Sequence, residues 1–137
     1  ESWYDGACSS LLSPTAAAQA PRGPEGTDGG TLTERILRTC SQVLYVEEVL
    51  VVPLSAVLRR LPLGIIVELL KVDAQGHDLA VVESGGAWVP DLVQEIQLEV
   101  QDLSPGSTML MYAGQPTRIE VKARMRELGF EEQSCSL

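Results

Sequence analysis

The feature that most constrains the fold is a nearly continuous apolar run at residues 65–72 (IIVELLKV), which ends in Asp73. Short runs of this kind are typical of a strand buried on both faces of a parallel sheet. Gln75 and Gly76 predict a turn, and residues 78–84 predict a short helix that the following glycines end. We therefore expect an α/β fold in which a buried strand carries Asp73 at its carboxyl end.

Further segments predict strands. Residues 43–52 (VLYVEEVLVV) are rich in β-branched side chains, and Pro53 ends the run. Residues 93–100 alternate polar and apolar side chains, with Glu99 on the polar face. A last short strand is expected to begin at Phe130. Because helices separate these strands along the chain, the pattern indicates a mostly parallel sheet.

Three further helices are predicted. A capping-box pattern that begins at Thr31 predicts a helix over residues 31–40. Ser55 is the expected cap of a short helix over residues 56–61. Residues 117–128 form an amphipathic pattern that the next glycine ends. The expected buried positions of this last helix are Ile119, Val121, Met125 and Leu128.

The chain divides into two parts. Pro, Gly and Ala dominate residues 13–30, and no apolar periodicity is present there. Such a composition is typical of a loop or a disordered segment, so residues 1–30 are interpreted as a flexible loop or insertion. Residues 31–137 are expected to form the ordered unit.

The composition excludes several classes of function. The 137 residues carry a formal net charge of -9, which argues against a nucleic-acid partner bound through its phosphates. No apolar run reaches the ~20 residues of a membrane span, so no membrane partner is expected. The length allows one domain of ordinary size. Because the chain begins at Glu1 and not at Met, we expect a processed or excised piece of a longer protein.

The three cysteines, Cys8, Cys40 and Cys135, are widely spaced and form no CxxC motif. An odd number with this spacing is not a disulfide framework, so free thiols in a reducing compartment such as the cytoplasm are expected. A zinc site would need about four ligands, and only His77 could join the cysteines, so no metal is expected.

Two acids are candidates for chemistry. Asp73 either points into a ligand cleft or caps the helix that follows it. Glu99 either faces solvent or is a second carboxylate of the same cleft. If the two strands are neighbours, the acids could share a substrate hydroxyl or a cation.

Two further residues are candidates for substrate contacts. His77 is the single histidine and is either a general base or a structural turn residue. Tyr112, in the segment MYAGQP, either closes over a ligand or packs on the surface of the domain.

Taken in order, four stretches resemble the FkbM family of S-adenosylmethionine-dependent methyltransferases. They are LLKVDAQGHDL at residues 69–79, IQLEV at 96–100, MYAGQP at 111–116 and MRELGF at 125–130. The resemblance implies a Rossmann-like class I methyltransferase fold and O-methylation of a small-molecule or sugar hydroxyl. By the resemblance, Asp73 ends the strand that borders the methyl-transfer site and Glu99 ends the next strand, so both are expected catalytic residues. His77, which stands where the family often has a small residue, and Tyr112 are the expected substrate-binding residues.

The chain departs from the family in its first part. The family's cofactor-binding half, a strand followed by a glycine-rich loop, precedes these stretches, and residues 1–42 contain no such segment. The fold is therefore expected to be truncated, with residues 31–137 as the C-terminal part of the methyltransferase domain. S-adenosylmethionine is the implied cofactor, the residues that bind it are unknown, and the chain alone is expected to be inactive.

Two alternatives stay open at this point. The first is a degenerate, non-catalytic interaction domain, which would associate with itself through an uncovered sheet edge. The second is a small hydrolase-like enzyme that uses Asp73 and His77, although no GxSxG motif supports it.

Overall fold

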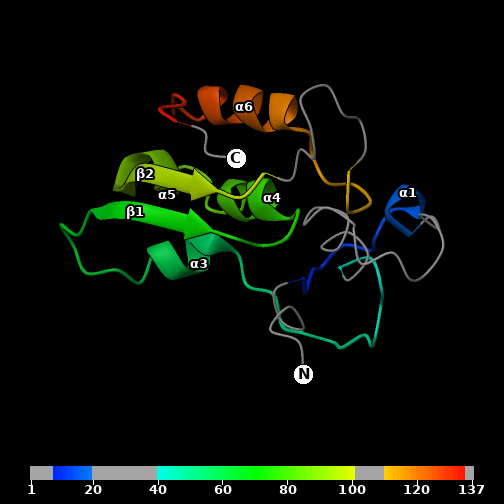
Figure 1. The fold of residues 1–137 in the computed structure, drawn as a ribbon. Helices are drawn as coiled ribbons and strands as arrows, with labels where there is room; N and C mark the ends of the chain where they lie inside the picture. The colour runs from blue at the N-terminus through cyan, green and yellow to red at the C-terminus, as the bar shows by residue number, and fades with distance from the viewer. Residues whose placement is uncertain (1–7, 20–39, 101–109, 135–137) are drawn as a thin grey trace.

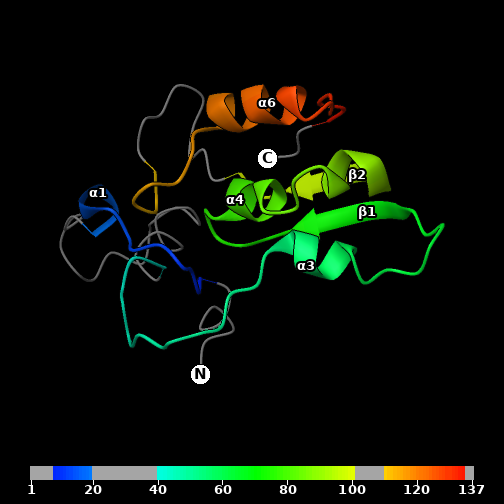
Figure 2. The ribbon, with the colours of Figure 1, turned by 180° about the vertical axis from the view of Figure 1, so that it is seen from behind.

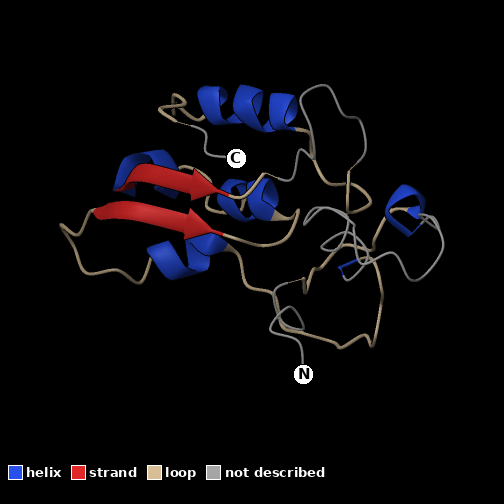
Figure 3. Ribbon diagram, viewed as in Figure 1, coloured by secondary structure: helices blue, strands red, loops and turns tan. Residues whose placement is uncertain are grey.

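The computed structural model describes residues 8–19, 40–100 and 110–134. In this part of the chain two parallel strands form one sheet, β1 (Val67–Val72) and β2 (Val93–Leu98) (Figures 1 and 3). Their register runs from Val67 opposite Val93 to Val72 opposite Leu98. The expected α/β class with parallel strands is confirmed. The sheet is smaller than expected, with two strands among the described residues.

Helices surround this pair of strands. The helix α3 (Leu54–Leu58) precedes β1, and the connection from β1 to β2 contains α4 (Asp78–Glu83) and α5 (Trp88–Leu92). Both ribbon views show α3 beside β1, and α6 (Arg118–Glu127) on the side of β2 (Figures 1 and 2). No helix in the described part of the chain is long and apolar enough to span a membrane.

The core lies between the strands and these helices. It is built from five buried residues, Leu58, Val72, Val82, Val89 and Val93. Burial of a valine or leucine side chain stabilises a fold by about 1.5–3 kcal/mol, so this cluster supplies much of the driving force for the unit. The connection between α4 and α5 is tight, because a Cβ at Gly85 would lie 2.3 Å from Val89 Cγ2. The sequence did not predict α5, a five-residue helix that contains Pro90.

The helix α6 follows its sequence pattern closely. Thr117 is its N-cap and forms a capping box with Glu120. Val121 is buried, and Met125 and Leu128 pack on the core from α6 and its C-cap. The expectation for Ile119 was wrong, because its side chain is 81% exposed.

Three expectations about strands were wrong. Residues 43–52 are exposed and form no strand, because no neighbouring strand is available to them among the described residues. The run at 65–72 is not buried on both faces, since only Val72 of β1 is buried. Phe130 packs against the core from a loop and begins no strand. β-propensity reflects packing against neighbours, and a sheet of two strands offers few of them.

The start of α3 also differs from the prediction. The helix begins at Leu54, and its N-cap position is Pro53, so Ser55 is not the cap. The backbone N–H of Leu54 donates to Ser84 Oγ at 2.9 Å. A residue from the end of α4 therefore satisfies the first helical donor, which a local sequence pattern does not reveal.

The N-terminal segment is attached to the loop at residues 110–115. Pro14 and Tyr112 form an isolated antiparallel β-bridge. Thr15 N–H donates to Met111 O at 2.8 Å, and α1 (Ala16–Gln19) follows. Cys8 and Cys40 form a disulfide, with their Cα atoms 5.1 Å apart. The helix predicted at residues 31–40 lies outside the described residues except at its last residue.

The expectation of free thiols was therefore wrong for Cys8 and Cys40. The two cysteines are 32 residues apart in sequence, and only the folded chain brings their Cα atoms into the range of a disulfide. Cys135 lies outside the described residues. The argument for a reducing compartment, which rested on free thiols, no longer applies.

Candidate functional site

The carboxyl edge of the sheet brings the two predicted acids together. Asp73 follows β1 directly, and Glu99 follows β2, where its N–H donates to Val72 O at 3.3 Å. The side-chain amide of Gln75 lies between them. Its Nε2 atom donates to Asp73 Oδ1 at 3.0 Å and to Glu99 Oε2 at 2.8 Å. The parallel register produces this arrangement, because both strands end at one edge.

The two acids have opposite pKa shifts. A hydrogen bond with Glu99, then one with Gln75 and the charge of Lys71, lower the pKa of Asp73. Partial burial of the carboxyl, followed by the hydrogen bond and the charge of Asp73, raises the pKa of Glu99 to about 7. The outer side of Glu99 remains exposed, so solvent screens part of this repulsion. Near neutral pH Glu99 is therefore about half protonated, whereas Asp73 stays ionised.

The turn after Asp73 is closed by a different acid. Asp78 is 4% exposed, and its carboxylate accepts from Ala74 N–H at 3.2 Å and from Gly76 N–H at 3.1 Å. The alternative in which Asp73 caps the helix was wrong. The N-cap position of α4 is His77, whose side chain makes no capping bond.

Gly76 allows the loop at residues 111–116 to pack on this turn. Its φ is +91°, and an added Cβ would lie 3.0 Å from Tyr112 Cδ2 and 3.2 Å from Gln115 Cδ. Both of those side chains are buried. The Tyr112 hydroxyl lies 3.1 Å from Cys8 O and 3.3 Å from Gln75 Oε1, and these two acceptors share its single hydrogen.

Tyr112 is 1% exposed, so its ring is part of the interior in this structure. Desolvation, and then the charge of Glu99, raise the pKa of Tyr112 to about 12, which keeps the hydroxyl protonated as a donor. His77 is half-buried, and it does not line the small hollow beside Glu99 that is described below. The substrate-binding roles of Tyr112 and His77 stay predictions.

Sequence reasoning missed the residue at the centre of the site, Gln75. The signal that could have found it is its position, one residue before the turn glycine and two after Asp73. Ser10 and Cys8 were also missed, because their contacts with the site span more than 60 residues of chain.

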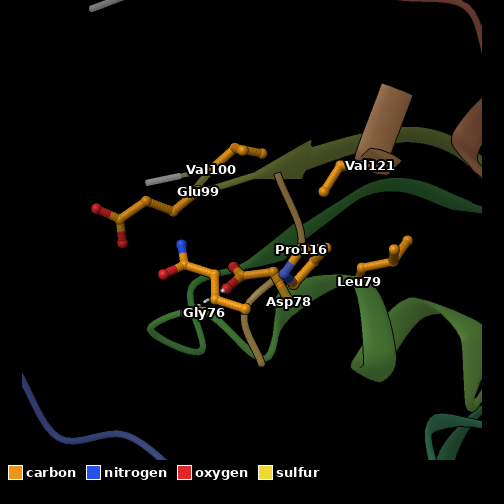
Figure 4. Close-up of a pocket in the computed structure, with 8 residues that line it drawn as sticks. Gly76, Asp78, Leu79, Glu99, Val100, Pro116 and Val121 are labelled. Atoms are coloured by element: carbon orange, nitrogen blue, oxygen red, sulfur yellow. Dashed lines mark hydrogen bonds between the residues drawn. The ribbon is translucent and has the colours of Figure 1, made fainter. Parts of the chain in front are cut away.

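A small, open hollow lies beside Glu99, and Asp73 does not line it. Its cavity volume is about 10 Å³, far below the roughly 300–1,000 Å³ of typical ligand pockets. It is lined by Gly76, Asp78, Leu79, Glu99, Val100, Gln115, Pro116 and Val121 (Figure 4). In the part of the chain that the structure describes, no group of three His, Cys, Asp or Glu side chains could hold a metal ion.

Three comparisons with known proteins give no match: no family model, no curated protein and no solved structure is similar to this chain. The interpretation of the site therefore rests on its geometry and on the four stretches described above.

Proposed function

We propose that this chain contributes the acceptor side of an S-adenosylmethionine-dependent methyltransferase of the FkbM kind, which methylates a hydroxyl of a small molecule or sugar. One observation supports the proposal. The first two stretches that carry the resemblance contain the ends of β1 and β2, and the other two pack against the unit that these strands form. Tyr112 and Gln115 pack on Gly76, while Met125 and Phe130 pack against the core cluster of buried residues.

The described residues do not themselves fit S-adenosylmethionine. The hollow beside Glu99, with a cavity volume of about 10 Å³, is too small for a nucleoside with an amino-acid tail. The sequence of residues 1–42 shows no pattern typical of a strand followed by a glycine-rich loop, the element that approaches such a cofactor in the family. The proposed contribution of this chain is therefore limited to the acceptor, and other residues would have to bind the methyl donor.

The divergent pKa values of the two acids support the acceptor role. Asp73, whose pKa is lowered, stays ionised and would accept a hydrogen bond from the acceptor hydroxyl. Glu99, whose pKa is raised to about 7, is better suited to take the hydroxyl proton when it is ionised. Methylation of an aligned hydroxyl depends mostly on positioning, so the orienting role of Asp73 is expected to matter more.

The first test is the binding of S-adenosylmethionine to this chain by isothermal titration calorimetry. We expect no measurable heat of binding, because the described residues lack a site for the cofactor. Tight binding would show that the division between a donor part and an acceptor part is wrong. Sequencing of the gene upstream of Glu1 adds a check, since a strand followed by a GxGxG motif is expected there.

The second test uses the longest natural protein that contains these residues, with methyl-labelled S-adenosylmethionine and a panel of sugars, polyols and phenols. Asp73→Asn is expected to reduce turnover about 100-fold while cofactor affinity changes less than about 3-fold. Asp91→Asn, at an exposed position of α5, is the matched control and should leave both values unchanged. Unchanged turnover in Asp73→Asn would remove this residue from the reaction.

A second candidate function, a non-catalytic interaction domain that associates with itself, is favoured by the exposed apolar chain before α3. Within residues 43–52, Val46 is 87% exposed and Leu50 is 92% exposed. Extended apolar segments of this kind are prone to pair with another sheet edge. Analytical ultracentrifugation should then show a dimer that Val46→Lys converts to a monomer. A wild-type chain that stays monomeric at high concentration would exclude this candidate.

A further inference from the structure

The side-chain amide of Gln75 is held in one orientation. A carboxamide donates only through its nitrogen and accepts only through its oxygen. Its Nε2 atom faces Asp73 Oδ1 at 3.0 Å and Glu99 Oε2 at 2.8 Å, while its Oε1 atom accepts from the Tyr112 hydroxyl at 3.3 Å. Two N–H groups thus meet two carboxyl groups, and the tyrosine sets which end of the amide faces them.

The backbone at Gln75 indicates that its side chain is needed. Its φ is 47°, and it is the only residue other than glycine with a positive φ among the described residues. A non-glycine residue in this region costs about 1 kcal/mol or more, and glycine or asparagine would be adopted there more easily. A long amide at a position that favours glycine is consistent with a role for the side chain.

A segment near the N-terminus contacts the backbone of Gln75 and the tyrosine that faces its side chain. Ser10 Oγ donates to the backbone carbonyl of Gln75 at 2.7 Å. The carbonyl of Cys8 accepts from the Tyr112 hydroxyl at 3.1 Å. Because Cys8 is bonded to Cys40, this segment is tied to the chain that leads into α3. The disulfide therefore limits how far the segment can move from the turn.

We propose that Gln75 is a positioning residue that keeps the side chains of Asp73 and Glu99 together, and that the disulfide-linked residues 8–10 keep Gln75 in place. The inference rests on the proposed function only in its meaning for catalysis. The contact itself can be tested on this chain without a cofactor or an acceptor.

The main test measures the titration of the Glu99 carboxyl by carbon-13 NMR in the wild-type chain and in Gln75→Gly. Glycine suits the backbone conformation, so the variant should fold at least as well as the wild type. If Gln75 keeps the acids together, its loss lets Glu99 swing into solvent and away from Asp73. The Glu99 midpoint is then expected to fall by at least about one pH unit.

The direction of the shift decides between two explanations. Gln75 donates a hydrogen bond that by itself lowers the pKa of Glu99. If Gln75 only donates and does not position the pair, its removal should raise the Glu99 midpoint or leave it unchanged. Either of those results would overturn the proposal. Gln97→Ala removes an exposed glutamine of β2 that lies two residues before Glu99, and it should leave the Glu99 midpoint unchanged.

The segment is tested by the double variant Cys8→Ser with Cys40→Ser. Loss of the disulfide should move the Glu99 midpoint in the same downward direction as Gln75→Gly, by a smaller amount, while the unit around the strands stays folded. An unchanged midpoint would remove the segment from the proposal. The proposed function fails on a different result, unchanged turnover in Asp73→Asn, so the two failures can be told apart.

Discussion

The contact between the turn after β1 and the loop at residues 111–116 is tested by Gly76→Ala. Alanine at this position meets two costs. The first is the φ of +91°, which costs a residue with a Cβ about 1–2 kcal/mol. The second is overlap, since the new Cβ would lie 3.0 Å from Tyr112 Cδ2 and 3.2 Å from Gln115 Cδ.

The overlap cannot be relieved cheaply. Tyr112 is 1% exposed and Gln115 is 5% exposed, so neither side chain can move into solvent without losing its packing. Overpacking of this kind costs about 1–3 kcal/mol, and alanine recovers up to about 1 kcal/mol by restricting the unfolded chain. We therefore expect Gly76→Ala to lower the free energy of unfolding by about 3 kcal/mol.

Gly114→Ala is the matched control. Gly114 lies in the same loop and has a φ of +81°, but no atom lies within 4 Å of the Cβ that would be added. Its loss should be about 1 kcal/mol, which isolates the backbone cost. The assay is urea unfolding followed by tryptophan fluorescence. Equal losses in the two variants would refute the reasoning, because the packing of Tyr112 and Gln115 on the glycine would then contribute nothing.

Three further predictions concern the acids and the last helix. Because the folded pKa of Glu99 is raised to about 7, its protonation contributes stability below the ordinary pKa of 4.5 that is lost as pH rises through about 7. Glu95→Gln, at an exposed position of β2, is the control. Relative to this control, Glu99→Gln should reduce the change of the unfolding free energy with pH by about 1 kcal/mol after solvent screening. A curve that parallels the control would contradict this prediction. Asp78→Ala leaves two backbone N–H groups without their acceptor and should cost about 2–3 kcal/mol in urea unfolding, whereas Asp91→Ala should cost less than about 0.5 kcal/mol. Thr117→Ala removes the capping box of α6 and should cost about 1 kcal/mol, and a melting temperature equal to wild type would show that the cap is not needed.

Elements whose signals are local were predicted from the sequence. The alternation at residues 93–100 predicted β2, and the run ending at Asp73 predicted β1. The amphipathic pattern at residues 117–128 and the stop at Gly129 predicted α6, because both signals are local to the helix. The expectation that Asp73 and Glu99 would lie at one edge followed from the parallel pairing of their strands.

Features that depend on distant residues were not predictable. Residues 43–52 have the composition of a strand, yet no strand pairs with them in the described chain. The strand that their β-propensity predicted is therefore not formed. The prediction that Ile119 is buried was wrong, because an amphipathic pattern predicts an apolar stripe but not how much of that stripe a neighbouring element covers.

The sequence by itself predicted β1, β2 and the acids that follow them, but its local pattern predicted a strand at residues 43–52 as well. The tertiary structure alone decided how those acids behave. The amide that bridges them, the tyrosine that contacts this amide and the disulfide that ties the N-terminal segment to it all come from positions far apart in the chain. Hydrogen bonds and burial act through space, so the proton on Glu99 is a property of the folded arrangement and not of the local sequence.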